Sequence, residues 1–348
     1  MTPGTGDAPL PSRVGVVGAG LISAYHLDAL AMLEDAPVEA IVATRPERAA
    51  SAAARYGAPH ALTDWRELRG LVDVAIIATP DDTHADLARG LVAEGIAVMV
   101  QKPLAASAAD AAALVADSPP HLISASFMHR HLDATVALEA VLRSGALGEI
   151  MSARIRNATP GPDWGAWFYQ GNGPTAGVVG QLGVHGIDLV EHLLGRITSV
   201  QAMTATRMPR RTMRDGEVVE SSVPDHALAH YRLSNGVLVS HEQCWAEAGG
   251  TERFAMEVHG TEASAVLRTP SSPIGIHWRS GEWQALELDR EPVLGFRHHR
   301  AWIDSVRRGA DDGTARDAVR GLLVAETIGR AAREQRTIEL PGEERGTT

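Results

Sequence analysis

Residues 13–23 read RVGVVGAGLIS, which is a short apolar run, two glycines one residue apart and the start of a segment with helical spacing. In the pattern G-x-G-x-x-G, the first glycine permits a tight turn and the second lets the backbone approach a pyrophosphate at a helix N-terminus. Gly18 and Gly20 occupy these positions, and Ser23 is small enough for the third. We therefore expect a dinucleotide-binding loop, and a turn without a ligand is the alternative. The expected contacts are Gly18, Ala19, Gly20, Leu21 and Ile22.

Strands and helices alternate along the residues that follow this loop. Apolar runs without polar alternation are typical of strands buried on both faces of a parallel sheet. They occur at 38–43, 73–78, 96–100 and 121–125, and helical segments occur at 20–33, 46–56, 83–94 and 107–117. This alternation predicts an α/β fold with a doubly wound parallel sheet, a Rossmann domain, over residues 12–125.

Residues 126–341 predict a second α/β domain with an open, mainly antiparallel sheet, because short strands and turn signals such as Ser234-Asn235-Gly236 follow one another. Strands are expected at 149–157, 197–206, 226–233, 237–245, 253–259, 263–268, 274–278, 283–288 and 336–340. Helices that cover one face of the sheet are expected at 131–144, 177–194, 297–309 and 315–334. Residues 207–224 predict a loop or irregular hairpin, and 1–11 and 342–348 predict flexible tails.

The composition narrows the class of protein. Of the 348 residues, 45% are hydrophobic and 22% are charged, which is typical of a soluble globular chain. The formal net charge of −11 offers no basic field to nucleic acid or an anionic membrane, so neither is an expected partner. No apolar run reaches the ~18 residues that span a bilayer, and the start of the chain lacks a signal-peptide pattern. With Cys244 as the single cysteine, no intrachain disulfide can form, and we expect a cytoplasmic protein.

The chain contains a single lysine, Lys102, and arginine supplies the other permanent positive side chains. Lys102 follows the strand expected at 96–100, and ligands bind at the carboxyl edge of such sheets. Lysine can lose its proton near neutral pH when its pKa is lowered, whereas arginine cannot. We therefore expect Lys102 to have a chemical function, and a surface lysine is the alternative.

Two more segments lie at the same expected sheet edge. Ala78-Thr79-Pro80 ends the strand at 73–78, and we expect these residues to contact the cofactor. His84, a few residues later, either contacts the cofactor or has a structural role. Gln101, next to Lys102, is also expected to contact the cofactor.

The end of the second expected strand predicts the nucleotide. NAD requires an acidic residue there for its ribose hydroxyls, whereas the 2′-phosphate of NADP prefers arginine. Residues 43–48 read ATRPER, with no acidic side chain at the strand end, and Thr44, Arg45 and Arg48 can bind a phosphate. NADP(H) is therefore the expected cofactor, with NAD(H) as the second choice. Arginines that only face solvent are the alternative.

Gln181, His185, Asp188 and His192 are spaced i, i+4, i+7 and i+11 in the helix expected at 177–194, which places them on one face. His185 can act as an acid or base. A metal bound by His185, Asp188 and His192 is a weaker alternative, because no other ligand cluster accompanies them, and we expect no metal. A polar seam between domains is the remaining alternative.

Residues 163–169 read DWGAWFY and hold four aromatic side chains. Aromatic faces suit the apolar side of a sugar ring, so Trp164 and Trp167 are expected substrate contacts. Packing at a domain joint is the alternative.

Together these motifs resemble the Gfo/Idh/MocA family of sugar and polyol oxidoreductases over nearly the whole chain. The resemblance rests on the loop at 18–23, Thr79-Pro80 with His84, Gln101-Lys102-Pro103, the turn Ser144–Gly148 and the stretch QLGVHGID at 181–188. It implies a Rossmann domain followed by an α/β domain whose open sheet forms the substrate wall and a homo-oligomer interface. It also implies hydride transfer to or from a sugar, sugar derivative or cyclitol, with catalytic Lys102 and His185. Gln181 is then expected to orient the substrate.

Two amides depart from the family pattern, since Gln101 stands for a usual glutamate and Gln181 for a frequent aspartate. An amide forms hydrogen bonds but cannot take a proton. Without these anions the pKa of Lys102 is expected to fall, which suits a proton donor and acceptor. Two alternatives stay open: a cofactor-binding sensor or scaffold without redox turnover, and an enzyme that uses transient oxidation with a retained cofactor.

Overall fold

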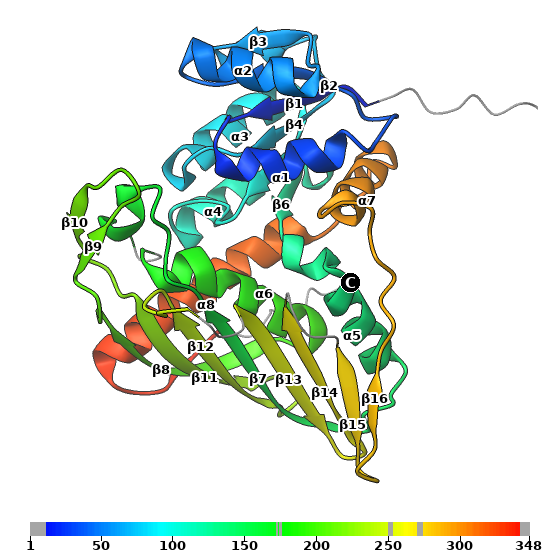
Figure 1. The fold of residues 1–348 in the computed structure, drawn as a ribbon, viewed down its shortest axis with the longest axis vertical. Helices are drawn as coiled ribbons and strands as arrows, with labels where there is room; N and C mark the ends of the chain where they lie inside the picture. The colour runs from blue at the N-terminus through cyan, green and yellow to red at the C-terminus, as the bar shows by residue number, and fades with distance from the viewer. Residues whose placement is uncertain (1–11, 172, 174–175, 250–252, 270–273, 342–348) are drawn as a thin grey trace, which may run out of the picture. The chain divides into compact units, whose positions relative to one another are not determined.

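A computed structural model describes residues 12–171, 173, 176–249, 253–269 and 274–341, and the tails expected at 1–11 and 342–348 lie outside them. The chain divides into two compact units, each with its own large sheet (Figure 1). Unit 1 contains the chain up to residue 104 together with 113–126 and 291–315. Unit 2 contains 105–112, 127–290 and the chain from 316 onward. The expected α/β class is confirmed.

Unit 1 is built on six parallel strands in the order β3-β2-β1-β4-β5-β6. The strands are β1 (Val14–Val17), β2 (Val38–Val42), β3 (His60–Leu62), β4 (Val74–Ile77), β5 (Ala97–Gln101) and β6 (Ile123–Ser126). The five strands expected from apolar runs are confirmed. Strand β3 was not expected, because three residues at a sheet edge, with Ala61 exposed between two half-buried neighbours, are too few to show a pattern.

The helices expected between these strands are also present. They are α1 (Leu21–Leu30), α2 (Pro46–Tyr56), α3 (His84–Ala93) and α4 (Ala108–Ala116). Helix α2 starts with proline at its first position and ends at Gly57 in the left-handed conformation, both common helix boundaries.

Helix α7 (Phe296–Arg307) belongs to unit 1, although the sequence analysis placed it in the second domain. Its Trp302 and Ile303 pack in the same core as Leu27 of α1 and the sheet. Arg300 also forms two hydrogen bonds of 2.7 and 2.8 Å with the Asp35 carboxylate. The amphipathic pattern predicts the helix but not which sheet it covers, so the expected boundaries differ from the observed units here.

Unit 2 contains nine strands in the order β16-β15-β14-β13-β7-β12-β11-β8-β17. The strands are β7 (Ile150–Ala158), β8 (Ile197–Ala205), β11 (His226–Leu233), β12 (Leu238–Cys244), β13 (Phe254–Gly260), β14 (Ala263–Thr269), β15 (Gly275–Trp278), β16 (Trp283–Ala285) and β17 (Ile338–Glu339). Neighbours are antiparallel except β7 and β12, so the mainly antiparallel sheet is confirmed.

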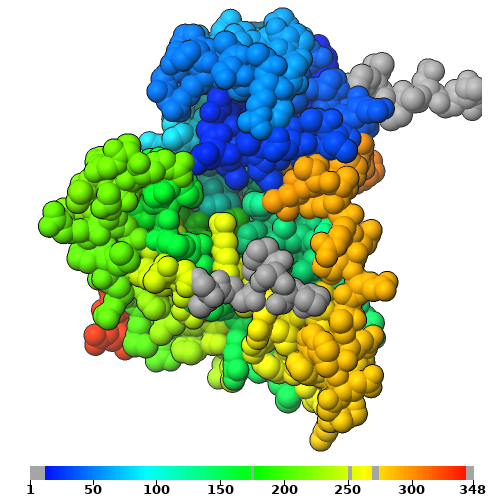
Figure 2. Space-filling model, in the orientation of Figure 1, coloured from blue at the N-terminus to red at the C-terminus, as the bar shows by residue number. Residues whose placement is uncertain are grey.

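A separate hairpin supplies the expected irregular region at 207–224. It pairs β9 (Arg210–Thr212) with β10 (Val218–Glu220). The lime-green hairpin stands out from the large sheet of unit 2 (Figures 1 and 2). It therefore does not extend that sheet.

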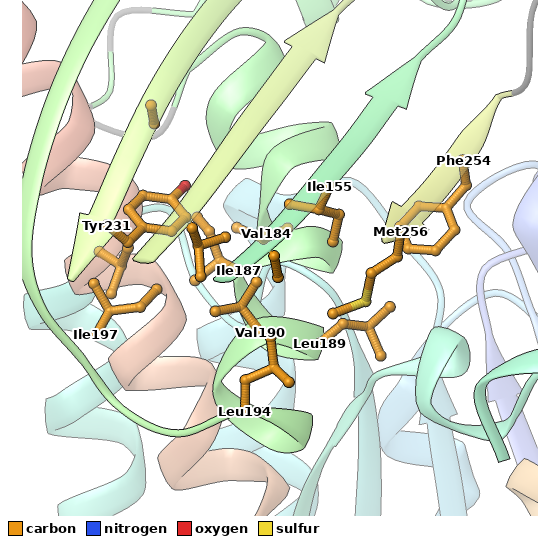
Figure 3. Packing of buried hydrophobic residues seen from close by; sticks show 14 of the residues in the cluster. Ile155, Val184, Ile187, Leu189, Val190, Leu194, Ile197, Tyr231, Phe254 and Met256 are labelled. Atoms are coloured by element: carbon orange, nitrogen blue, oxygen red, sulfur yellow. The ribbon is translucent and has the colours of Figure 1, made fainter. Parts of the chain in front are cut away.

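One face of the large sheet is covered by α5 (Asp133–Arg143), α6 (Val184–Leu193) and α8 (Thr314–Glu334), which share its hydrophobic core. Ile187 and Val190 of α6 belong to the same hydrophobic cluster as Ile155 and Met256 of the strands (Figure 3). The opposite face of the sheet is exposed along β11, where buried and exposed residues alternate. No helix in the described ranges is long and apolar enough to cross a membrane.

Candidate active site

The glycine loop lies where the strand order of unit 1 reverses. Strand β1 pairs with β2 on one side and with β4 on the other. Gly18 has a φ of +113°, and a Cβ there would collide with the carbonyl oxygen of Ala78. Only glycine fits this close approach of two loops at the switch point, which is where nucleotides bind in doubly wound sheets.

The N-terminus of α1 fits a pyrophosphate. Its N-cap is Gly20, no side chain caps the helix, and no acidic residue occupies the first turn. A Cβ on Gly20 would meet no atom within 4 Å, and Leu21 and Ile22 are exposed. Ala19, between the two glycines, is half-buried. The backbone N–H groups of this turn can therefore bind an anion.

The end of β2 presents positive charge. Thr44, Arg45 and Arg48 are exposed, and Arg45 is the N-cap of α2. Within the described part of the chain, neither guanidinium forms an ion pair. Ala43, half-buried, supplies no carboxylate for a ribose. The end of β2 thus carries two exposed guanidinium groups, with Glu47 between them in the first turn of α2.

The segment Ala78-Thr79-Pro80 follows β4, and His84 connects it to the loop after β5. Nδ1 of His84 is 2.7 Å from the carbonyl oxygen of Pro103, and Nε2 is 2.9 Å from that of Thr79. Burial lowers the pKa of His84, and the two carbonyls oppose that shift. Because both ring nitrogens face protein carbonyls, His84 ties the two loops together and offers neither nitrogen to a ligand.

Lys102 directly follows β5 at the same edge and is half-buried. The backbone N–H of Lys102 donates a 3.1 Å hydrogen bond to Oε1 of Gln101. Unit 1 therefore brings all its expected site residues to one sheet edge: the glycine loop, the end of β2, the loop after β4 and the lysine.

In unit 2, His185 is the second residue of α6, and a π-helical turn, Val179–Gly183, precedes it. One continuous helix was expected over 177–194, and the π turn breaks the regular spacing from Gln181 to His185. The π turn widens the helix, and such turns are frequent at functional sites. Gln181 is half-buried, and His185 is buried.

The ring of His185 stacks on that of His129, with centroids 4.2 Å apart and planes 9° apart. Phe254 packs edge-on against His129 at 5.3 Å. His129 was missed, although its place just after the last strand of the parallel sheet was a usable signal. The stack fixes the orientation of the His185 ring.

Arg130, next to His129, binds Asp188 of α6 through three hydrogen bonds, two of them 3.0 and 3.1 Å long, and Asp317 at 2.8 Å. Burial raises the pKa of Asp188 to about 6, and Arg130 opposes that shift. Asp188 therefore anchors the turn that carries His129. His192 lies 3.5 Å from Glu139.

Asp188 and His192, which were expected to share a face with His185, thus lie beside partners of their own. Within the described residues, no group of three or more His, Cys, Asp or Glu side chains can hold a metal ion.

Helix α6 approaches the sheet over polar side chains. A Cβ on Gly186 would lie 2.5 Å from Nε2 of His241 and 2.7 Å from Oδ1 of Asn157. His241 also lies 2.9 Å from the Tyr231 hydroxyl, and burial lowers the pKa of His241 to about 3. Glycine lets the helix that carries His185 sit directly on this neutral, buried row.

The aromatic loop divides into a buried and an exposed part. Tyr169 is fully buried and donates a 2.8 Å hydrogen bond to the carbonyl oxygen of Pro162. Trp164 and Trp167 are 50% and 42% exposed, and Trp167 stacks on Phe168 with centroids 3.7 Å apart. The two tryptophans are therefore available to a ligand, while the rest of the loop packs.

A nucleotide-binding parallel sheet followed by an open mixed sheet with a buried histidine defines the class of two-domain oxidoreductases. Residues 12–118 match the family model described as "Oxidoreductase family, NAD-binding Rossmann fold", and residues 135–266 match the "GFO/IDH/MocA C-terminal domain". The chain belongs to the Gfo/Idh/MocA family, and unit 1 carries its NAD-binding Rossmann domain. The expected NAD(P)-dependent oxidoreductase is thereby confirmed.

Named relatives agree with this assignment. The chain is 30% identical to an inositol 2-dehydrogenase of Leifsonia xyli over 314 residues, 86% of each chain. It is 29% identical over 320 residues to a levoglucosan dehydrogenase of Pseudarthrobacter phenanthrenivorans, covering 82% of this chain and 79% of that one. A solved levoglucosan dehydrogenase in complex with NADH and L-sorbose has the same fold, with a TM-score of 0.86, 22% identity and coverage of 95% and 99%.

The close approach at Gly186 generates a stability prediction. Gly186→Ala is expected to lower the free energy of unfolding by about 1–3 kcal/mol, because the new methyl group overpacks against His241 and Asn157. Gly321→Ala in α8 is the matched control, since a Cβ there meets no atom within 4 Å, and it is expected to be neutral or stabilising by about 0.5–1 kcal/mol. Denaturant unfolding of both variants measures the difference, and equal stabilities would contradict the packing argument.

Proposed function

We propose that this chain catalyses the NADP(H)-dependent interconversion of a hydroxyl and a carbonyl on a sugar, sugar derivative or cyclitol. The observation that carries the proposal is the place of the single lysine, Lys102, at the carboxyl end of β5, on the sheet edge that carries the glycine loop. That edge is where a dinucleotide binds in such sheets.

The substrate class is supported by the names of the relatives, which include levoglucosan, inositol and D-apiose dehydrogenases. The exposed faces of Trp164 and Trp167 suit the apolar side of a sugar ring. Gln181 can hydrogen-bond a substrate hydroxyl without taking its proton. We therefore assign a small carbohydrate-like substrate, in a cytoplasmic enzyme that needs no disulfide.

The bound cofactor supplies hydride chemistry at the nicotinamide C4. The chain must move the accompanying proton. In the oxidation direction, neutral Lys102 takes the proton from the substrate hydroxyl through Nζ, and in reduction it returns that proton to the carbonyl oxygen. His185 assists or replaces Lys102 in this transfer, and the stacked His129 keeps its ring in one orientation.

Lys102 is expected to be irreplaceable by arginine. Lys102→Arg and Lys102→Met should both bind NADPH but lose turnover by about 10²-fold or more, because a guanidinium supplies charge without a titratable proton. Turnover is measured by NADPH absorbance on pooled sugars and cyclitols, and cofactor binding by intrinsic fluorescence. Near-normal turnover of the arginine variant would remove Lys102 as the proton-transfer group.

Two variants on α6 accompany this test. His185→Ala is expected to lower turnover by about 10²–10⁴-fold. His192→Ala, about two turns further along the same helix, should leave turnover unchanged.

The same assay separates the other functions considered. A sensor or scaffold forms no NADPH with any substrate, and an enzyme with a retained cofactor converts substrate without releasing NADPH.

Because Arg45 and Arg48 are exposed at the end of β2, we expect tighter binding of NADP(H) than of NAD(H), although Glu47 lies between them in the first turn of α2. Arg45→Ala combined with Arg48→Ala should weaken NADPH binding and leave NADH binding unchanged, because only the 2′-phosphate loses partners. Ala43→Asp should shift the preference toward NAD(H) by repelling that phosphate and binding the free hydroxyls. Fluorescence titrations with both cofactors measure this, and equal or tighter NAD(H) binding by the natural chain contradicts the assignment.

The open face of the unit 2 sheet supports a homo-oligomer. Met203 of β8 is exposed, and it pairs directly with Leu228 of β11, which is also exposed. Leu238 of β12 adds a third exposed apolar side chain on the same sheet. Met203→Glu and Leu228→Glu should reduce the mass measured by light scattering, whereas Met208→Glu, exposed outside the sheet strands, should not. An unchanged mass in both sheet variants contradicts an interface on this face.

A further inference from the structure

Gln101 carries an interaction that the reaction above does not use. Its side chain lies on the sheet face covered by α1 and α7, because it shares the alternation of Ala97 and Met99, which belong to that core. The side chain is buried, at 5% exposure. A buried amide requires partners for both its oxygen and its nitrogen.

A continuous set of hydrogen bonds provides these partners. Oε1 of Gln101 accepts from the backbone N–H of Lys102 at 3.1 Å, and Nε2 of Gln101 is 2.8 Å from Nε2 of His26 on α1. Nδ1 of His26 is 2.8 Å from Nε2 of His299 on α7. Nδ1 of His299 is 2.7 Å from the carbonyl oxygen of Gly295. Both imidazole rings are fully buried.

The chemistry of the two ends determines the direction of every bond. At one end the carbonyl of Gly295 can only accept, so Nδ1 of His299 donates. At the other end the N–H of Lys102 can only donate, so the Gln101 oxygen faces it and the Gln101 nitrogen donates to His26. Neutral rings connect the two requirements without conflict, since each then accepts at Nε2 and donates at Nδ1.

The surroundings favour neutral rings. Burial lowers the pKa of His26, and it lowers the pKa of His299 to about 4. Titratable groups beside the pair are Tyr25 on α1 and His298 on α7, and Glu291 before α7 acts on Tyr25. Tyr25 lies 2.9 Å from Nδ1 of His298, and burial raises the pKa of this tyrosine, so it is uncharged. Glu291 accepts hydrogen bonds from the backbone N–H groups of Gly295 and Arg297 at 3.1 and 3.0 Å.

We propose that Gln101 is a positioning residue for Lys102, because it sets the direction of an uncharged hydrogen-bond chain that ties the lysine backbone to helix α7. The chain runs from Gly295 through His299 and His26 to Gln101. The proposal rests on the proposed function only in giving Lys102 the proton-transfer role. According to this proposal, residues 291–315 help to hold the sheet edge of unit 1 that carries Lys102.

Glutamate at position 101 cannot replace the amide unless it or the buried histidine pair takes up one proton. As a carboxylate it accepts from Lys102 N–H but needs a donor at Nε2 of His26. The His26 ring then either carries a second proton or accepts at Nδ1, which obliges His299 to donate from both nitrogens. In each case the buried pair holds one additional proton.

The direction of the chain is tested in the natural protein by ¹⁵N NMR of the histidine side chains. Both His26 and His299 are expected to be neutral at pH 7 with the proton on Nδ1. His26→Gln and His299→Gln assign the two signals. A proton on Nε2 of either ring, or an imidazolium in the natural protein, overturns the proposal whether or not any other variant folds.

Gln101→Glu tests the charge requirement through stability as a function of pH. In the natural chain, the lowered histidine pKa values cost stability only as the pH falls below about 6.5, where the unfolded rings bind protons that the folded rings do not. In the variant, the folded pair binds a proton above pH 6.5 that the unfolded chain releases. Its unfolding constant should therefore increase relative to the natural chain by up to tenfold per pH unit from 6.5 upward.

Gln170→Glu adds the same charge at an exposed position and is expected to follow the natural chain. A Gln101→Glu variant with the natural pH dependence overturns the charge requirement. A carboxylate beside Lys102 should also move the acid limb of the kcat/KM profile to higher pH, because an anion raises the lysine pKa. An unmoved limb overturns the positioning role. If Lys102→Arg stays active, the proposed function fails, while the NMR and stability results still decide the hydrogen-bond chain.

Discussion

The parallel pairing of β1 between β2 and β4 is the constraint on which the rest of unit 1 depends. Parallel neighbours cannot be joined by a tight turn, so each connection crosses over the sheet as a helix. Strand order reverses beside β1, and the loops after β1 and β4 meet there. Gly18 is the point of contact, because a side chain would collide with the carbonyl of Ala78. This strand order therefore determines which edge of the sheet carries the expected site residues.

Buried histidines supply the second layer of order, beside ion pairs such as that of Arg130 with the buried Asp188. His26, His299 and His241 are each buried with their ring nitrogens hydrogen-bonded to protein atoms. Burial lowers the pKa of all three, because an imidazolium in such surroundings loses its hydration. A neutral ring still needs an acceptor for its N–H and a donor for its other nitrogen, so each histidine holds the groups that it joins at a fixed distance.

Most of unit 1 could be predicted from the sequence, because its strands are apolar runs without polar alternation and its expected site residues follow those strands directly. The exception is β3, whose three residues carry no pattern of their own. In unit 2 the hairpin at 207–224 was expected, but the π turn before His185 was not. Its stretch VGQLG contains two glycines, which weaken a regular helix, and a Cβ on Gly183 would collide with the side chain of Gln243 on β12. The stack of His129 on His185 joins residues more than fifty positions apart, so no local pattern contains it.

The sequence by itself determined the alternation of strands and helices, the glycine loop and the position of the lone Lys102, because each depends on neighbours within a few residues. Only the tertiary structure decided that α7 returns to unit 1, that Asp188 binds Arg130 instead of sharing a ligand with His185, and that Gln101 meets two buried histidines. The physical reason is common to all three. Hydrophobic burial and hydrogen-bond satisfaction select partners by proximity in space, and the sequence records the need for a partner without recording which one meets it.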